Sequence, residues 1–225
     1  MLNYEVSPDL LEPLVPAGVE LDRWSGTLYV SVVGFVFRDT RVLGVPVPWH
    51  RTFEEVNLRF YVRRDVGGDA RRGVVFIREI VPRSAIAVVA RLLYNEPYRA
   101  LPMSRRLLRS SSDVADFEYA WRVAGEWSSI HARTAGSPRP LGVGSEEEFI
   151  TEHYWGYTRQ RDGGTVEYRV AHPRWNVWTA TESRLEGNVA RVYGPAFARA
   201  LAGPPRSAFV ADGSAVTVFA PTRIR

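Results

Sequence analysis

The stretch that decides the fold is EVNLRFYV, residues 55–62, in which polar and apolar side chains alternate. In an extended strand, successive side chains point to opposite faces. One face then carries Val56, Leu58, Phe60 and Val62, and the other carries Glu55, Asn57, Arg59 and Tyr61. If the polar face meets solvent, it is an ordinary wet sheet face. If it faces a barrel interior, an acid, an amide, a guanidinium and a phenol line one wall of a pocket.

The segments on either side of this stretch predict neighbouring strands at residues 27–37 (TLYVSVVGFVF) and 73–81 (GVVFIREIV). In the second segment, alternation places Glu79 on the same face as Val75, Ile77 and Val81. A buried carboxylate must be paired or have a raised pKa, because burying an unpaired charge is costly. Arg59 on the adjacent strand is the expected partner of Glu79, and a structural ion pair is the alternative to a catalytic acid.

Short strands dominate the rest of the chain. We expect them at residues 117–123, 129–134, 154–160, 165–172 and 177–185, with a closing hairpin of 209–211 and 215–219 around Asp212-Gly213-Ser214. Helices are expected at 85–94, 146–152 and 196–202, the first two capped by Ser84 and Ser145. This pattern predicts a β-rich α+β fold, a closed antiparallel β-barrel with a few peripheral helices and an internal cavity, in a single domain over residues 1–225.

The composition excludes several kinds of chemistry. All 29 basic residues counted as Lys or Arg are arginine, and the chain has no cysteine. Lysine Schiff-base catalysis and thiolate chemistry are therefore excluded. The arginines are scattered, whereas a nucleic-acid module concentrates them on one stripe, so we expect no nucleic-acid partner. The absence of a long apolar run and of a signal peptide predicts a cytoplasmic protein with no membrane partner.

A second group of candidates is rich in aromatic and imidazole side chains. Strand alternation places His153, Trp155 and Tyr157 on one face of residues 153–157, and Tyr168 and His172 on one face of residues 168–173. The two histidines are candidate general acid/base groups, and satisfied core residues are the alternative. Their spacing matches no zinc motif, so we predict neither a metal nor a cofactor.

Several strings closely resemble the uncharacterised YqjF-like family. They are GFVFRDTRVLGVPVPWHRTFEEVNLRFYV (34–62), RRGVVFIREIV (71–81), ARLLYNEPY (90–98), EHYWGYT (152–158) and YRVAHPRW (168–175). The resemblance covers nearly the whole chain. It implies a cone-shaped β-barrel with a buried cavity, because the family is grouped by fold with acetoacetate decarboxylase.

A more distant resemblance bears on the mechanism. Acetoacetate decarboxylase has a stretch of the form G-R-E-x-x-G-x-P-K-K, whose first lysine forms the Schiff base and whose second lowers the pKa of the first. Residues 90–99 are similar to that stretch, with Tyr98 and Arg99 at the places of the two lysines. The resemblance therefore implies that the nucleophile is absent while a neighbouring cation remains, and that Tyr98 is a candidate acid or base.

We accordingly expect a barrel that binds a small organic anion, such as a keto acid, and that has acid/base but not Schiff-base chemistry. Arg59 or Arg99 would bind the carboxylate, and proton transfer would come from Glu79, Tyr98, His153 or His172. The other expected lining residues are Glu55, Asn57, Tyr61, Trp155 and Tyr168. A non-catalytic ligand-sensing or interaction protein on the same scaffold is the alternative, and a homo-oligomer is left open.

Overall fold

The computed structural model describes residues 1–38, 41–42, 45–46, 52–84, 87–88, 95–109 and 113–224. The helix expected over residues 85–94 falls largely outside this part of the chain. No helix among the described residues is both long and apolar enough to cross a membrane. The cytoplasmic location stays a prediction.

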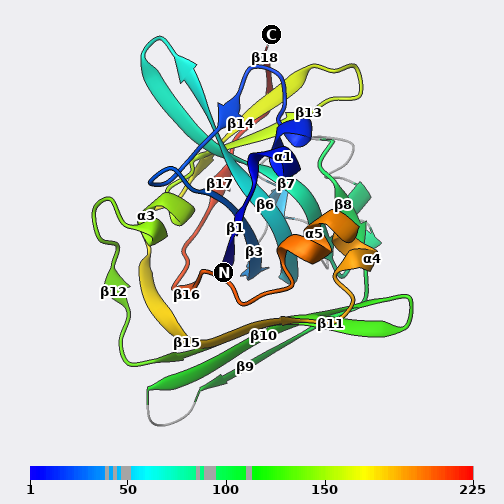
Figure 1. Cartoon of the computed structure of the whole chain (residues 1–225), viewed down its shortest axis with the longest axis vertical. Coiled ribbons are helices and arrows are strands. Elements are labelled where there is room, and N and C mark those ends of the chain that lie inside the picture. The colour runs from blue at the N-terminus through cyan, green and yellow to red at the C-terminus, as the bar shows by residue number, and fades with distance from the viewer. Residues whose placement is uncertain are drawn as a thin grey trace.

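One large sheet organises the molecule (Figure 1). Its main path runs through β17 (Thr217–Val218), β14 (Thr165–Ala171), β13 (Trp155–Arg159), β7 (Asp69–Val81), β6 (Phe53–Val66), β3 (Leu28–Phe37), β1 (Leu2–Val6), β16 (Ser207–Ala211), β15 (Asn176–Glu186), β11 (Glu126–Ala135), β10 (Val114–Val123) and β9 (Met103–Arg109). Off this path lie β2 (Glu20–Leu21), β8 (Tyr98–Ala100), β12 (Arg139–Pro140) and β18 (Thr222–Ile224), while β4 (Arg41–Val42) and β5 (Val45–Pro46) form a separate pair.

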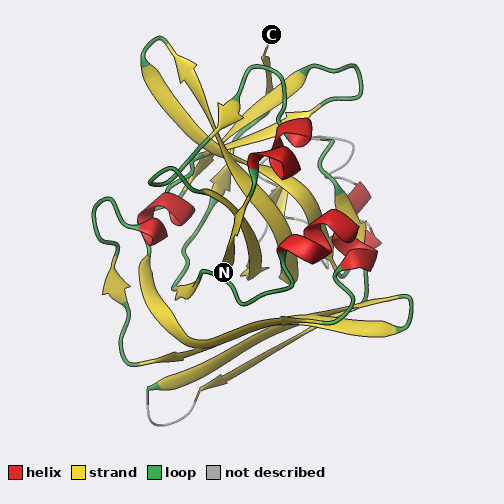
Figure 2. Cartoon of the chain, in the orientation of Figure 1, coloured by secondary structure: helices red, strands yellow, loops and turns green. Residues whose placement is uncertain are grey.

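The helices are few and short, as Figure 2 shows. Those with described bounds are α1 (Pro8–Leu11) with the 3-10 turn η1 (Glu12–Leu14), α3 (Glu146–Thr151), α4 (Ala190–Tyr193) and α5 (Pro195–Ala200). The β-rich class with few helices is confirmed. The pairings are mostly antiparallel, but β8 and β13 both pair with β7 in parallel. Among the described strands no ladder joins β17 to β9, so closure of the barrel and its internal cavity stay predictions.

Strand β6 is buried on both faces. Val56, Leu58, Phe60 and Val62 are fully buried in the main core. On the opposite face, Glu55 is 1% exposed and Asn57 is 2% exposed, so the polar row is not a wet sheet face. Desolvation of polar side chains costs free energy, so polar groups buried this deeply are hydrogen-bonded as a rule, and those that are not are candidates for a functional role.

A β-bulge in β7 changes which side chains share this polar face. Asn57 lies opposite Glu79 and Leu58 opposite Arg78, but Arg59 lies opposite Phe76, so Ile77 is the extra residue. The consequence shows in the core, where Val75 and Ile80 both contact the main cluster although a regular strand would point them apart. Our expectation that Glu79 shares a face with Val75 was therefore wrong, because the bulge turns Glu79 onto the polar face of β6.

The ends of the other predicted strands agree with the structure to within a few residues. The structure also contains strands that we did not predict, such as β1 and β9, and one prediction was wrong. Ser145 caps α3 as expected, since its hydroxyl accepts a hydrogen bond from the Glu148 amide at 3.1 Å. The wrong prediction was the closing hairpin, in which residues 209–211 would pair with residues 215–219. Strand β16 pairs with β1 and β15, and β17 pairs with β14. The Asp212 carboxylate accepts from Asn176 instead of closing a hairpin turn.

Two layers of the molecule meet at Gly34 of β3. In the view of Figure 1, strands β9, β10, β11 and β15 form a layer below the strands around β6. A Cβ atom at Gly34 would lie 2.6 Å from Tyr119 Cδ2 and 2.7 Å from Ile130 Cδ1, which belong to β10 and β11. The missing side chain therefore allows the two layers to approach each other.

We predict that Gly34→Ala destabilises the protein by about 1–3 kcal/mol, because an added methyl group overpacks this contact. Chemical denaturation followed by circular dichroism measures the effect. Gly203→Ala is the control, since a Cβ atom there meets nothing within 4 Å. Equal stability of the two variants would contradict the close contact at Gly34.

Candidate functional site

Three adjacent strands bring acidic and phenolic side chains into one row. Asn57 of β6 lies opposite Glu79 of β7, which in turn lies opposite Tyr98 of β8. Glu55 lies two residues before Asn57 on the same face of β6. Glu96, just before β8, is also buried, with 5% of its surface exposed. We call the group of Glu55, Asn57, Glu79, Glu96, Tyr98, Thr158 and Tyr168 the carboxyl cluster.

The first half of the carboxyl cluster is centred on Glu55. The Tyr98 hydroxyl donates to Glu55 Oε2 at 3.0 Å, and Asn57 Nδ2 donates to Glu55 Oε1 at 3.0 Å. Tyr98 also makes a hydrogen bond with Glu79. A single phenol therefore links two buried carboxyl groups.

The second half is centred on Glu96. Its Oε1 atom accepts hydrogen bonds from the Thr158 hydroxyl at 2.5 Å and from the Tyr168 hydroxyl at 2.9 Å. Tyr168 of β14 lies opposite Gly156 of β13, and a Cβ atom at Gly156 would lie 2.1 Å from Tyr168 Cζ. Glycine at this position leaves room for the ring that carries the phenol to Glu96.

Burial shifts the proton affinity of all three carboxyl groups. It raises the pKa of Glu55 to about 7, although Asn57, Tyr98 and Arg59 act in the opposite direction. It also raises the pKa of Glu96 to about 7, against hydrogen bonds from Thr158 and Tyr168. The pKa of Glu79 lies well above its usual value because of burial and the nearby carboxylates of Glu96 and Glu55. Groups of this kind exchange protons near neutral pH.

Some acceptors in the carboxyl cluster have no partner. Within the part of the chain that the structure describes, Glu79 Oε2, Glu96 Oε2 and Asn57 Oδ1 are buried without a hydrogen bond. Each such atom costs about 1–3 kcal/mol unless something else satisfies it. The described residues contain no group of three or more His, Asp or Glu side chains arranged to hold a metal ion. The unsatisfied acceptors therefore favour a polar organic ligand or water at this place.

Arg59 lies next along the polar face of β6. Its Nη2 atom donates to the Ile150 carbonyl at 3.1 Å, and its guanidinium lies 5.6 Å from the centre of the Tyr61 ring. Its charge is close enough to lower the pKa of Glu55. The expected ion pair with Glu79 is not found among the described contacts, because the bulge places Glu79 opposite Asn57 instead of Arg59.

His153 belongs to a separate buried group. Arg72 Nε donates to Asp22 Oδ2 at 2.7 Å, and His153 Nε2 lies 3.5 Å from the same oxygen. The imidazole also packs against the rings of Tyr61 and Phe149. Burial, opposed by Asp22, lowers the pKa of His153 to about 4, so this histidine is neutral at pH 7.

The remaining predicted site residues also lie outside the carboxyl cluster. His172 stacks on Trp175 with 4.1 Å between ring centres. Arg99 donates to the Arg191 carbonyl at 3.3 Å. The Trp155 ring lies 4.4 Å from the Arg71 guanidinium. The Tyr61 hydroxyl is 2.6 Å from the Ser31 hydroxyl. Five of the predicted residues thus come together, namely Glu55, Asn57, Glu79, Tyr98 and Tyr168.

Sequence reasoning missed Glu96 and Thr158 as members of the site. Glu96 lies in a loop, where no alternation reveals the direction of a side chain. Its only signal was its place two residues before Tyr98 in the stretch that resembles the decarboxylase motif. Thr158 gave no signal, since a threonine in a strand is ordinary.

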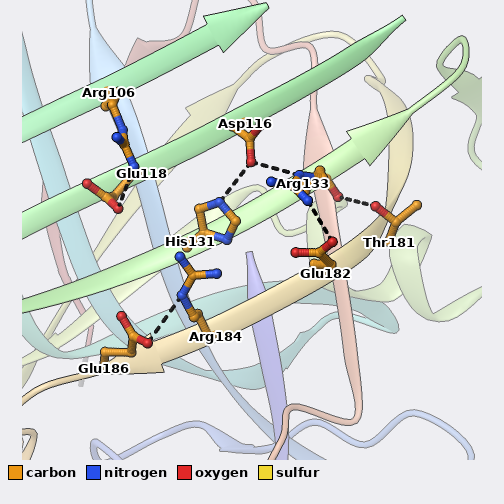
Figure 3. Close-up of polar contacts among 9 residues, drawn as sticks. All are labelled: Arg106, Asp116, Glu118, His131, Arg133, Thr181, Glu182, Arg184 and Glu186. Carbon is orange, nitrogen blue, oxygen red and sulfur yellow. Dashed lines mark hydrogen bonds and ion pairs between the residues drawn. The ribbon is translucent and has the colours of Figure 1, made fainter. Parts of the chain in front are cut away.

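Another polar network lies on the layer of β9, β10, β11 and β15 (Figure 3). Asp116 Oδ1 is 3.0 Å from His131 Nε2 and accepts from Arg133 Nε at 3.0 Å. Arg133 also donates to Glu182 Oε1 at 2.7 Å. Arg133 and Glu182 are 41% and 51% exposed. Exposed paired charges of this kind tie neighbouring strands together and contribute little free energy, so we assign this network a structural role.

Solved structures define the class of fold. Acetoacetate decarboxylase from Legionella pneumophila subsp. pneumophila str. Philadelphia 1 matches the whole chain and 83% of its own, with a TM-score of 0.60 and 13% identity. The enduracididine biosynthesis enzyme MppR, complexed with pyruvate, matches 99% of this chain and 84% of its own, with a TM-score of 0.62 and 14% identity. An acetoacetate decarboxylase-like enzyme from Sphingomonas wittichii RW1 gives a TM-score of 0.61 at 14% identity, over the whole chain and 89% of its own. The protein therefore has an acetoacetate decarboxylase-like fold.

The sequence itself places the protein in a family. Residues 1–215 match the family model DUF2071, described as an uncharacterized conserved protein (COG2071), so the chain belongs to that family. The uncharacterized protein YqjF of Bacillus subtilis (strain 168) is 27% identical over 193 residues, which cover 84% of this chain and 75% of that protein. The resemblance to YqjF-like proteins is thus confirmed.

We predict that Gly156→Ala destabilises the protein by about 1–3 kcal/mol, because the new methyl group displaces the Tyr168 ring from Glu96. Denaturant unfolding measures the loss. Gly142→Ala is the matched control, since its nearest contact would be an ordinary 3.6 Å. In a Tyr168→Ala background the Gly156→Ala penalty should largely disappear, and a full penalty there would refute this account.

The raised pKa values of Glu55 and Glu96 predict a pH dependence of stability. The folded state holds protons that the unfolded state releases above pH 4.5, so these groups stabilise at low pH and this contribution is lost as the pH rises to about 7. The loss is on the order of a few kcal/mol. His153 acts in the opposite direction between pH 4 and 6.5. The free energy of unfolding is therefore measured against pH for the wild type and for Glu96→Gln, and the difference between the two curves is the contribution of Glu96. Identical curves would contradict the raised pKa of Glu96.

Proposed function

We propose that the carboxyl cluster binds a small keto acid and catalyses proton transfer at the carbon next to its carbonyl group. The observation that carries the proposal is the gathering of three buried carboxyl groups with raised pKa values in one cluster, two of which, Glu55 and Glu79, are hydrogen-bonded to the Tyr98 hydroxyl. A reaction of this class needs an acid at the carbonyl oxygen and a base at the carbon. It needs no lysine, and the chain has none.

The residues divide into roles according to their charge. Burial and the neighbouring carboxylates raise the pKa of Glu79 well above its usual value, so we assign Glu79 the role of the acid that donates to the ligand's ketone oxygen, beside the Tyr98 hydroxyl. Glu55, with a pKa of about 7, accepts the proton from carbon while Glu79 transfers its proton to the ketone oxygen, which gives a neutral enol. In the reverse step Glu79 recovers its proton and Glu55, after exchanging its proton with solvent, returns one to carbon. Arg59, next along the same face of β6, binds the carboxylate.

The similar structures add support to the choice of ligand. MppR is a protein of the same fold in complex with pyruvate, and acetoacetate decarboxylase is named for a keto acid. At 13–14% identity these proteins share the fold, and the choice of keto acid for this chain remains our proposal. His153, His172 and Arg99 stay outside it because they lie in other contacts.

Solvent deuterium exchange tests the reaction. Pyruvate incubated with the protein in D₂O should exchange its methyl protons faster than in buffer alone, as followed by proton NMR. Glu79→Gln and Tyr98→Phe should each slow the exchange by about 10²-fold or more, the range expected for a lost general acid. The matched controls are Glu20→Gln and Tyr154→Phe, whose side chains make exposed or separate contacts.

Thermal unfolding with millimolar keto acids tests binding separately. A ligand at about 100 times its Kd adds roughly 2.7 kcal/mol, a shift of about 5–10 °C for a domain of this size. Arg59→Ala should abolish the shift and Arg63→Ala, an exposed residue of the same strand, should keep it. Binding without exchange would favour the alternative of a ligand-sensing protein, and a flat panel would reject both roles for this cluster.

A further inference from the structure

The large sheet has two ends, and the strand at each end has one side without a strand partner. Strand β9 lies at one end and β17 at the other, and no further ladder joins either of them to a described strand. In the view of Figure 1, β9 belongs to the lower layer and β17 lies above it. A free sheet edge is a template for another strand, and proteins usually protect such an edge with charged side chains or proline.

The edge at β9 is protected by charge, and the edge at β17 is not. Strand β9 carries three arginines within its 7 residues. Residues 213–222, which include β17, contain no charged side chain. Val216, Val218 and Phe219 of this stretch are 43%, 47% and 42% exposed. Apolar and β-branched side chains on an open edge favour pairing with another strand.

The hydrogen bonds of β17 show which of its backbone groups point outward. The Phe219 amide donates to the Arg169 carbonyl at 2.9 Å, in line with the ladder that joins β17 to β14. In an antiparallel ladder, residues that bond to the neighbouring strand alternate with residues whose N–H and C=O groups point away from it. Thr217 therefore also bonds toward β14, whereas Val216 and Val218 direct their backbone groups to the free side.

We infer that β17 pairs with β17 of a second copy of this chain, antiparallel and about a two-fold axis at Thr217. In this register Val216 of each copy lies opposite Val218 of the partner subunit, and both residues use their outward backbone groups. Ala215 lies opposite Phe219 of the partner subunit, so apolar side chains meet on both faces of the new ladder.

The sequence around β17 suits pairing with itself. Valine stands on both sides of Thr217, so the same contacts form in both directions across the axis. The nearest charged residues along the chain are Asp212 before the stretch and Arg223 after it, so antiparallel pairing brings unlike charges to each end. These two side chains also have partners in their own copy, Asn176 and Asp162, and neither end opposes the pairing.

The same arrangement at β9 would be unfavourable. A two-fold axis at Arg106 would set this guanidinium opposite its own copy, and an axis at Leu107 would set Arg105 opposite Arg109 of the partner subunit. Like charges directly opposite each other destabilise a pair of strands. The contrast between the two ends of the sheet selects β17. Closure about a two-fold axis covers the free edge of β17 in both copies, so the expected assembly is a dimer.

Sedimentation of the full chain, at concentrations up to the millimolar range, tests the inference, with twice the chain mass of 25.4 kDa expected for the dimer. Thr217→Arg and Thr217→Glu each place like charges opposite each other and should each give a monomer. An equimolar mixture of the two variants should recover the dimer, because unlike charges then meet at the axis. Ser104→Arg adds a charge at an exposed position of β9 and should leave the dimer intact.

Val218→Pro tests the backbone contribution separately. The Val218 nitrogen points to the free side, so proline removes a donor between the copies and none to β14. The Kd of the dimer should rise by at least about tenfold, because the two-fold axis repeats the lost hydrogen bond. Circular dichroism of each variant verifies that the fold is kept.

The outcomes decide for or against the pairing. A monomer at every concentration would overturn the inference. A dimer that persists in both Thr217 variants would also overturn it, because the interface would then lie elsewhere. Folded Thr217 variants that stay monomeric when mixed would reject the axis at Thr217. Fibrils or assemblies that grow with concentration would contradict a closed pair.

Discussion

The bulge at Ile77 allows strand β7 to keep its apolar side chains in the core and to place Glu79 in the carboxyl cluster, which a regular strand could not do. Strand β7 must keep Val75 and Ile80 in the main core, and it must also place Glu79 beside Asn57. These demands conflict under strict alternation, because residues an odd number apart point to opposite faces. One extra residue resolves the conflict and collects the acid groups on one side of β6. The shift places Glu79 opposite Asn57, and the pairing of Glu79 with Tyr98 of β8 then brings the phenol to the same place.

The cluster stores unfavourable free energy that the surrounding packing must offset. Three buried carboxyl groups, two of which keep an oxygen without a partner in the described structure, would be better solvated in an unfolded chain. The two-sided burial of β6 supplies the compensation, since Val56, Leu58, Phe60 and Val62 on its opposite face are fully buried in the main core. A site of this kind resists water, which strengthens each hydrogen bond inside it and lets carboxyl groups remain protonated near neutral pH.

Tyr98 shows how an acetoacetate decarboxylase-like scaffold can hold different chemistry. The resemblance places Tyr98 where a Schiff-base lysine would stand, and the structure places its hydroxyl between Glu55 and Glu79. A phenol cannot form an imine, but it donates a hydrogen bond to an oxygen. The burial that would favour a neutral lysine amine also keeps this phenol neutral, with a pKa well above its usual value. The fold thus sets the environment, and the residue at this one position sets the chemistry that is available.

The sequence by itself determined the three strands around residues 55–62, because period-two alternation there and the β-branched segments on either side are local signals. It also excluded lysine and cysteine chemistry, which needs no structure. It named five members of the carboxyl cluster but did not show that they meet, and it paired Glu79 with the wrong neighbour. Only the tertiary structure decided these points. The bulge depends on how two strands pair, Glu96 is brought in by a loop that follows no period, and the role of Gly156 depends on a ring from the opposite strand.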